Sequence, residues 1–173
     1  MFSLKPSTMA GVEPLVRRVL IVDPNAHIAK LLAESLKTLG SRDVTIEPGR
    51  DRGMQAAAAI EPTLIVTEFF DEIDGPAFIR GIRKSSLACR KAPIMVLSAN
   101  ATTSTIKAAR DAGAHEFLRK PFSQGDLLRR LENLSRVARP WVENAIYTGP
   151  DRRRFNSGAG MRRVTDMVEA GGI

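Results

Sequence analysis

Short apolar runs alternate with helical patterns along most of the chain, and this alternation constrains the fold more than any other feature. The runs are VLIV (19–22), DVTIE (43–47), TLIVT (63–67), PIMVL (93–97) and HEFL (115–118). Runs of this length that are rich in β-branched residues are typical of strands, and the continuous ones are typical of strands buried on both faces. Strands that alternate with helices predict a parallel sheet with right-handed crossovers and helices on both of its faces.

The residues that follow each run carry helix signals. In residues 25–40 the apolar side chains recur at helical spacing, and Gly40 is a natural stop. The apolar face of this helix is predicted to hold Ile28, Leu31, Leu32, Leu36 and Leu39. The same reasoning predicts further helices over residues 50–60, 76–84, 102–113 and 124–138. The predicted fold class is therefore α/β, a doubly wound, five-stranded parallel sheet.

The pattern divides the chain into an N-terminal extension (1–16), an α/β domain (17–138) and a basic C-terminal arm (139–173). The arm holds two Pro and five Gly, has no sustained apolar period, and carries the single Trp and the single Tyr of the chain. We expect an extended arm with a short helix near Met161–Ala170, either mobile or laid against a surface.

The composition favours a cytoplasmic globular protein. Hydrophobic residues make up 43% and charged residues 26% of the 173 positions, which excludes a disordered or membrane chain. No apolar run approaches the roughly 20 residues that span a bilayer, and the N-terminus lacks the apolar stretch of a signal peptide. The single cysteine, Cys89, suits a reducing compartment. The net charge of +7 is spread over the domain and the arm, and it favours acidic partners in general.

Four polar side chains stand at or just past the ends of predicted strands. They are Asp23, Glu68, Ser98 and Lys120. Because the carboxyl ends of parallel strands meet at one edge of a doubly wound sheet, we expect these side chains to converge. Carboxylates that hold a magnesium ion, one of them a phosphoryl acceptor, with a hydroxyl and a lysine that bind phosphoryl oxygens, would form a phosphoryl-transfer pocket.

Motifs in the same order and spacing carry a family resemblance. They are VLIVD, PTLIVTE, DG at 74–75, PIMVLSA, AARDAGA and EFLRKPF with its Lys-Pro pair. Over about residues 17–138 the chain resembles the response-regulator receiver domain, the CheY-like module of bacterial two-component signalling. The resemblance implies a flavodoxin-like (βα)5 fold. It also implies a phosphoacceptor aspartate after the third strand, two metal-binding acids after the first, and phosphoryl-binding or switch roles for Ser98, Lys120 and Phe117.

The departures from the family pattern fall on its functional positions. Pro24 replaces the second acid after the first strand, and proline cannot ligate a metal. Glu68 stands at the acceptor position, where its longer side chain misplaces the attacking oxygen. Aligning Thr67 with the acceptor instead would restore the loop length but would push the strand out of register. We therefore predict a degenerate acidic pocket of Asp23, Pro24 and Glu68: a pseudo-receiver without catalytic residues or cofactor, in which Mg²⁺ would bind only if the site is still competent.

Several residues have simpler interpretations. Asp23 could also cap the helix that begins near Asn25, and Lys120 is expected to pair with Glu68 or Asp23. Phe117 is interpreted first as a core side chain. Asp71, Glu72 and Asp74 are predicted to form a solvated acidic loop; the alternative is that one of them replaces the lost metal ligand. His27 and His115 are predicted to be surface residues.

The predicted function is a stand-alone, non-enzymatic receiver that binds protein partners in phosphorelay signalling. Too few residues follow Ala138 for a winged helix, so neither a DNA-binding output domain nor a nucleic-acid or membrane partner is expected. The resemblance implies docking through the fourth helix, fifth strand and fifth helix of the domain. That predicted face is basic and carries Lys107, Arg110, Arg119, Arg129 and Arg130, which favours an acidic partner.

The arm leaves two interpretations open. It is either a flexible basic tail or a recognition segment in which aromatic residues are interleaved with arginines; these residues are Trp141, Tyr147, Arg152, Arg153 and Arg154. The segment resembles the Y-x-G-P-D-R-R-R tail of receiver proteins of alphaproteobacteria, and the resemblance implies a family-specific docking element. The alternatives to the predicted function are a still phosphorylatable single-domain regulator and an effector that binds a cyclic dinucleotide through the arm.

Overall fold

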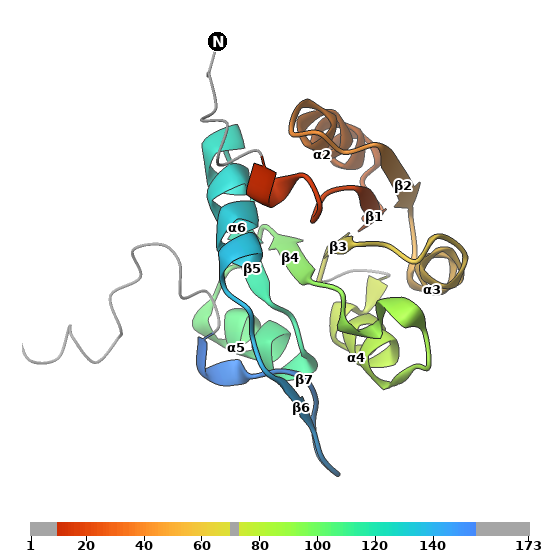
Figure 1. The fold of residues 1–173 in the computed structure, drawn as a ribbon, viewed down its shortest axis with the longest axis vertical. Coiled ribbons are helices and arrows are strands. Elements are labelled where there is room, and N and C mark those ends of the chain that lie inside the picture. The colour runs from red at the N-terminus through yellow and green to blue at the C-terminus, as the bar shows by residue number, and fades with distance from the viewer. Residues whose placement is uncertain (1–9, 70–72, 155–173) are drawn as a thin grey trace, which may run out of the picture.

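The computed structural model describes residues 10–69 and 73–154 and contains a five-stranded parallel sheet of order β2-β1-β3-β4-β5 (Figure 1). The strands are β1 (Arg18–Val22), β2 (Asp43–Glu47), β3 (Leu64–Thr67), β4 (Ile94–Ser98) and β5 (Glu116–Arg119). All pairings are parallel. The predicted fold class is therefore confirmed.

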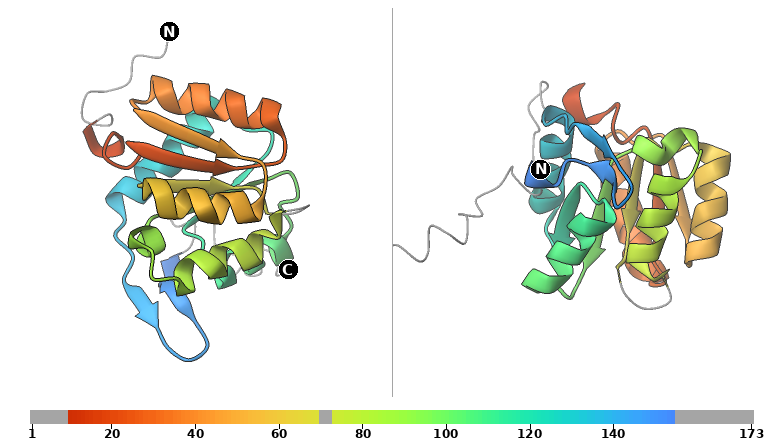
Figure 2. Two further views of the ribbon diagram at one scale, coloured as in Figure 1. Left: turned by 90° about the vertical axis from the view of Figure 1, so that its right-hand side faces the viewer. Right: turned by 90° about the horizontal axis from the view of Figure 1, so that it is seen from below.

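Helices cover both faces of the sheet (Figure 2). α2 (Ala26–Thr38) and α6 (Gln124–Arg136) pack on one face, in a core cluster that includes Leu32, Leu36, Leu127 and Leu131. α3 (Arg50–Ile60), α4 (Gly75–Lys84) and α5 (Thr103–Ala112) pack on the other, where Phe78, Ile79 and Ile82 meet Phe117. On the predicted apolar face of α2, Leu32, Leu36 and Leu39 are buried, whereas Ile28 is half-buried and Leu31 is 57% exposed.

Polar residues at the helix N-termini determine where most helices begin. The Asn25 side chain accepts a hydrogen bond from Ile28 N, and Thr102 does the same for Thr105 N. Ser123 and Asp126 form a reciprocal capping box at the start of α6. Each of these helices begins a few residues after the strand that precedes it. The loops that carry the polar side chains at the carboxyl edge of the sheet are therefore short.

Residues before the first strand contribute to the core. Val12 and Val16 are fully buried in the cluster between α2 and α6. Thr63 donates a hydrogen bond through its hydroxyl to Leu15 O, which ties this segment to the start of β3. These contacts lie at the amino-terminal edge of the sheet, opposite the edge where the predicted site lies.

Part of the C-terminal arm folds into a β-hairpin that the sequence did not predict. β6 (Trp141–Glu143) pairs antiparallel with β7 (Thr148–Pro150), followed by the short 3₁₀ turn η3 (Arg152–Arg154). The hairpin contacts α4 near the 3₁₀ turn η2 (Ala88–Lys91), and its tip projects from the domain (Figures 1 and 2). The helix expected near Met161–Ala170 lies outside the described residues. Within the described ranges, no helix is long and apolar enough to cross a membrane.

Candidate functional site

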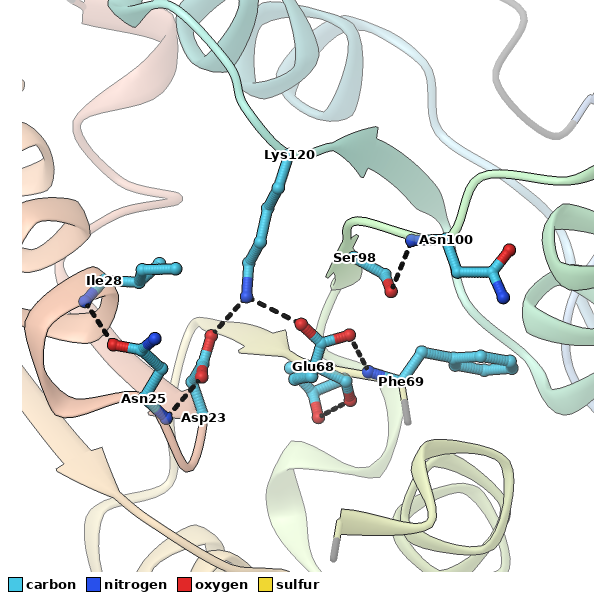
Figure 3. A network of polar contacts seen from close by, with 9 residues as sticks. Asp23, Asn25, Ile28, Glu68, Phe69, Ser98, Asn100 and Lys120 are labelled. Atoms are coloured by element: carbon cyan, nitrogen blue, oxygen red, sulfur yellow. Dashed lines mark hydrogen bonds and ion pairs between the residues drawn. The ribbon is translucent and has the colours of Figure 1, made fainter. Parts of the chain in front are cut away.

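The structure brings the four predicted polar residues to the carboxyl edge of the sheet (Figure 3). Asp23 directly follows β1, Glu68 follows β3, Ser98 ends β4 and Lys120 follows β5. Thr67 remains in β3, in register with Val22, and its side chain bonds to Glu68 O. Glu68, rather than Thr67, therefore points its side chain into the site.

Lys120 occupies the centre of this cluster. Its ammonium donates to Asp23 Oδ2 at 2.7 Å and to Glu68 Oε2 at 2.6 Å. The side chains of Lys120, Asp23 and Glu68 are only 11%, 4% and 10% exposed. The predicted ion pair is thus present with both acids at once, and it lies mostly out of solvent.

The remaining carboxylate oxygens are held by backbone donors. Asp23 Oδ1 accepts from Asn25 N at 2.8 Å, and Glu68 Oε1 accepts from Phe69 N at 2.8 Å. Each of the four oxygens therefore has one donor from the chain itself. Asn25, not Asp23, is the N-cap of α2, so the capping role considered for Asp23 is wrong. Asn25 outcompetes Asp23 because its side chain reaches the free N–H of Ile28.

The charge state of Lys120 follows from this geometry. Burial lowers the pKa of its ammonium, but the hydrogen bonds and charges of Asp23 and Glu68 outweigh that effect and raise the pKa above its ordinary value. Lys120 is therefore a fixed cation at neutral pH. It places a positive charge between the two acids of the pocket.

The side chains of Ser98 and Phe117 take no part in this ion pair. Ser98 is buried, and its hydroxyl accepts a long hydrogen bond of 3.4 Å from Asn100 N. Among the described residues its hydroxyl makes no hydrogen bond to Glu68 or Lys120, whereas its carbonyl oxygen accepts from Lys120 N at 2.9 Å. Phe117 is 2% exposed and packs in the core beneath α4 and α5, as its simpler interpretation predicted.

The donor set does not fit a magnesium site. Pro24 offers no side-chain ligand, and Lys120 already binds both carboxylates. Within residues 10–69 and 73–154, no three or more acidic, histidine or cysteine side chains cluster where they could hold a metal. Asp74 caps α4 by accepting from Ala77 N, whereas Asp71 and Glu72 lie outside the described residues.

A largely apolar groove opens beside Lys120. It lies between α2 and the loop from β5 to α6, where the Lys120–Pro121 peptide bond is cis. Ile28, the exposed Leu31, Phe122 and Gln124 line it.

The predicted basic face on α5, β5 and α6 is only partly free. Lys107, Arg119 and Arg129 are exposed, and Arg129 pairs loosely with Asp126. Arg110 pairs with its neighbour Asp111, and Arg130 pairs with the buried Glu116 at 3.2 Å. Arg130 therefore belongs to the packing of α6 on β5 more than to an open surface.

The hairpin turns its aromatic residues toward the domain. Tyr147 is buried and donates to Pro150 O at 2.6 Å, and the Trp141 ring lies 5.6 Å from the guanidinium of Arg83. Arg152 pairs with Asp111 and Arg153 pairs with Asp151. The side chain of Arg154 lies outside the described set. The arginines that are described are thus engaged within the chain.

The sequence reasoning missed a buried arginine next to this hairpin. Arg83 is fully buried and donates to the carbonyl oxygens of Gly113, Arg90 and Ala92. Burial lowers the pKa of its guanidinium to about 9, which still leaves it charged at neutral pH. Its position four residues after Ile79, on the apolar face of α4, was the available signal.

His115 was predicted to lie on the surface, and this prediction is wrong. The residue is 9% exposed because it enters β5 beside Ile94, whose N–H it accepts at Nδ1. The same ring nitrogen lies 3.0 Å from a guanidinium nitrogen of Arg83, a second donor. Burial and the charges of Arg83 and Arg139 lower the pKa of His115 well below its ordinary value, so the ring is neutral.

Comparison with known proteins identifies relatives of this chain among bacterial response regulators. The chain is 39% identical over 114 residues to the KDP operon regulatory protein KdpE of Escherichia coli, covering 65% of this chain and 48% of KdpE. It spans about half the length of several curated relatives of this kind.

Solved receiver structures share its fold. The chemotaxis response regulator CheY4 of Vibrio cholerae superposes with a TM-score of 0.63 at 22% identity, covering 69% of this chain and 98% of that one. The receiver domain of the sensor histidine kinase PA1611 of Pseudomonas aeruginosa has a TM-score of 0.61 at 27% identity, with 69% and 97% covered. That domain holds a magnesium ion in its active-site cleft.

Residues 19–132 match the response regulator receiver domain family. This match, the parallel five-stranded sheet and the cluster of Asp23, Glu68, Ser98 and Lys120 at its carboxyl edge lead to one conclusion: the chain belongs to the response regulator receiver domain family of two-component signal transduction.

Proposed function

We propose that this receiver works as a protein-interaction module whose candidate site is held by an internal ion pair instead of being switched by phosphorylation. It is proposed to act without enzymatic activity and without a metal cofactor. The observation that carries the proposal is the single ammonium of Lys120 bound to both Asp23 and Glu68, at 2.7 and 2.6 Å.

Both changes in the family pattern oppose phosphorylation. An acceptor carboxylate attacks in line, and its rate depends steeply on the placement of the attacking oxygen. Glu68 has one more methylene than aspartate, and its two oxygens are bound by Lys120 and Phe69 N. With Pro24 in place of an acid, a divalent cation would have to displace the lysine and replace its two contacts.

The proposed partner is an acidic protein surface that docks on α5, β5 and α6. Lys107 and Arg119 support this assignment because both are exposed and neither forms an ion pair with a described residue. Binding through such a face is expected to weaken with added salt, since screening reduces attraction between exposed charges. An affinity that is independent of salt would contradict it.

The deciding experiment is a backbone amide NMR spectrum recorded with and without Mg²⁺ and beryllofluoride, a phosphoryl mimic. We expect no shift at Asp23, Glu68, Ser98 or Lys120. Shifts clustered at these residues would instead support the alternative of a phosphorylatable regulator, which retains the family's hydroxyl and lysine positions. No contact favours a cyclic dinucleotide site, because Arg152 and Arg153 are paired with Asp111 and Asp151.

A further inference from the structure

The imidazole of His115, just before β5, faces two N–H groups with one of its nitrogens. The backbone N–H of Ile94 donates to His115 Nδ1 at 3.3 Å, and a guanidinium nitrogen of Arg83 lies 3.0 Å from the same atom. Neither group can accept a hydrogen bond, because a guanidinium and a backbone N–H are donors only. Nδ1 is therefore the unprotonated nitrogen, and the neutral ring carries its proton on Nε2.

Arg83 is held in this contact from several directions. Its Nε and Nη2 donate to Gly113 O at 2.9 and 2.8 Å. Its Nη1 donates to Arg90 O at 2.7 Å and to Ala92 O at 2.8 Å. The Trp141 ring of the hairpin lies 5.6 Å from the same guanidinium. Arg83 thus cannot turn away from the imidazole without breaking several other contacts.

The β6–β7 hairpin packs closely over this cluster. Arg139, just before β6, donates to His115 O at 3.0 Å. Gly113 lies between α4 and β7, and a side chain there would come within 3.0 Å of Arg83 Cγ and 3.5 Å of Thr148 O. The hairpin therefore approaches α4 and the start of β5 so closely that only a glycine fits between them.

The charged groups that face His115 are cations. Arg83 faces it from α4 and Arg139 from the segment before β6. Burial, together with these two charges, lowers the pKa of His115 well below its ordinary value. The other titratable groups beside Arg83 are Tyr147 of the hairpin and Cys89 of η2. Burial raises the pKa of both, so they are neutral at pH 7 and below.

The carboxylates of the surrounding elements are directed toward arginines other than Arg83. Among the described residues, none of these carboxylates is hydrogen-bonded to the His115 ring. The pairs are Glu116 with Arg130, Glu143 with Arg90, Asp111 with Arg110, and Asp151 with Arg153. No acid is thus placed to stabilise a protonated His115.

We infer that protonation of His115 releases the β6–β7 hairpin from α4 while the five-stranded sheet stays folded. A proton on Nδ1 would point at two N–H groups and would add a third positive charge beside Arg83 and Arg139. The hairpin is the element that yields, because its two three-residue strands pair only with each other, and an isolated hairpin is marginally stable in water. The strands β4 and β5 are mostly buried in the sheet.

The direction of the pH dependence follows from linkage. The released form exposes the ring, which then takes up a proton more readily than in the closed form. Closure is therefore fully favoured above the ordinary histidine pKa of about 6.5 and is weakened as the pH falls below it. The inference does not rest on the proposed function, because the candidate site lies at the opposite edge of the sheet.

Trp141, the single tryptophan of the chain, reports on the hairpin directly. Acrylamide quenching of its fluorescence measures release, and far-UV circular dichroism measures the rest of the fold. We expect quenching of the full chain to increase as the pH is lowered below about 6.5, while the dichroism is retained. Dichroism that is lost together with the hairpin contact would show global unfolding and would overturn the inference.

Three variants assign the transition to one group. His115→Asn keeps an acceptor near the Nδ1 position but does not titrate, so the increase in quenching should be absent. Burial raises the pKa of Glu116, and Glu143 holds the hairpin through Arg90. Glu116→Gln and Glu143→Gln should therefore each keep the transition. Its persistence in His115→Asn, or its loss in either glutamine variant, would contradict the role of His115.

A further measurement needs no variant. Long-range ¹H–¹⁵N NMR of the unaltered chain distinguishes the two nitrogens of each imidazole, and the exposed His27 supplies a reference ring. We expect His115 to carry its proton on Nε2 at pH 7 and to become protonated on Nδ1 over the same pH range as the increase in quenching. A proton on Nδ1 at pH 7, or a ring that titrates without any change at Trp141, would refute the inference.

Discussion

Lys120 and Glu68 form an ion pair 2.6 Å long that joins the ends of β5 and β3, two strands separated in the sheet by β4. The same ammonium also reaches Asp23 at the end of β1. One side chain thus ties together the carboxyl ends of three strands. We expect a site that is held in this way to resist both a metal ion and a change in the position of its loops.

Replacing Lys120 by Met should destabilise the protein, because it leaves two mostly buried carboxylates facing each other without their shared cation. Breaking one side of a buried ion pair costs about 3 kcal/mol. We expect a loss of this size in the free energy of unfolding measured by urea denaturation at pH 7. Lys107→Met, at an exposed and unpaired position, is the control and should change stability by less than about 0.5 kcal/mol. Equal losses for both variants would contradict the assigned role of Lys120.

Restoring the family's acids should restore metal binding. The double variant Pro24→Asp, Glu68→Asp places aspartate carboxylates at positions 23, 24 and 68, at the edge of the sheet. The side chain at position 68 is then one methylene shorter, and we expect it to lose the 2.6 Å contact that Glu68 makes with Lys120. Isothermal titration with Mg²⁺ should show binding at least about tenfold tighter than in the unaltered chain. Glu68→Asp alone should remain close to the unaltered chain. A single variant that binds as well as the double variant would show that Pro24 is not the limiting change.

Arg83→Lys should destabilise the protein although it preserves the charge. A lysine cannot reproduce the planar fork that donates to Gly113, Arg90 and Ala92 together, so at least one buried carbonyl loses its partner. The expected loss is about 2 kcal/mol in urea denaturation. Arg80→Lys, on the exposed face of the same helix, is the matched control and should be neutral. An unchanged stability for Arg83→Lys would mean that the fork is dispensable.

His115 should make stability depend on pH. Its pKa is lowered in the folded chain, so below the ordinary value of about 6.5 the unfolded chain binds more protons and stability falls as the pH falls. The contribution is fully present above about pH 6.5 and decreases by up to about 1.4 kcal/mol per pH unit below it. His115→Asn keeps an acceptor near Nδ1 but does not titrate. Thermal unfolding from pH 7 to 5 should therefore show a flatter profile for this variant, and identical profiles would refute the assignment.

The fold was accessible from the sequence because most of its strands are buried and its helices are amphipathic. VLIV and PIMVL carry the apolar, β-branched pattern that defines β1 and β4 within one residue. The convergence of Asp23, Glu68, Ser98 and Lys120 followed from topology alone, since parallel strands end at a common edge. That Lys120 binds both acids simultaneously depends on side-chain geometry, which the pattern does not contain.

Other features escaped the sequence for identifiable reasons. β6 and β7 have three residues each, too short to show a period of two, and their stability comes from contacts with α4. His115 was expected at the surface because it is polar. It is buried because Arg83 and Ile94 N, both distant in the sequence, lie within hydrogen-bonding distance of its ring. Asp23 and Asn25 are both good cap residues two positions apart, and only the geometry of the turn decides between them.

The packing of Val12 and Val16 at one end of the sheet has a consequence for truncating this domain or fusing it to another protein. A chain cut to the family boundaries, 19–132, would remove both valines, the end of α6 and the hairpin over Arg83. It would open an apolar surface and a buried cation to water while leaving intact every motif that carries the receiver resemblance, from VLIVD to EFLRKPF. Chimaeras that graft this receiver onto another protein should therefore keep Val12, Val16 and the β6–β7 hairpin, because the residues that pack together extend beyond the motif that identifies the family.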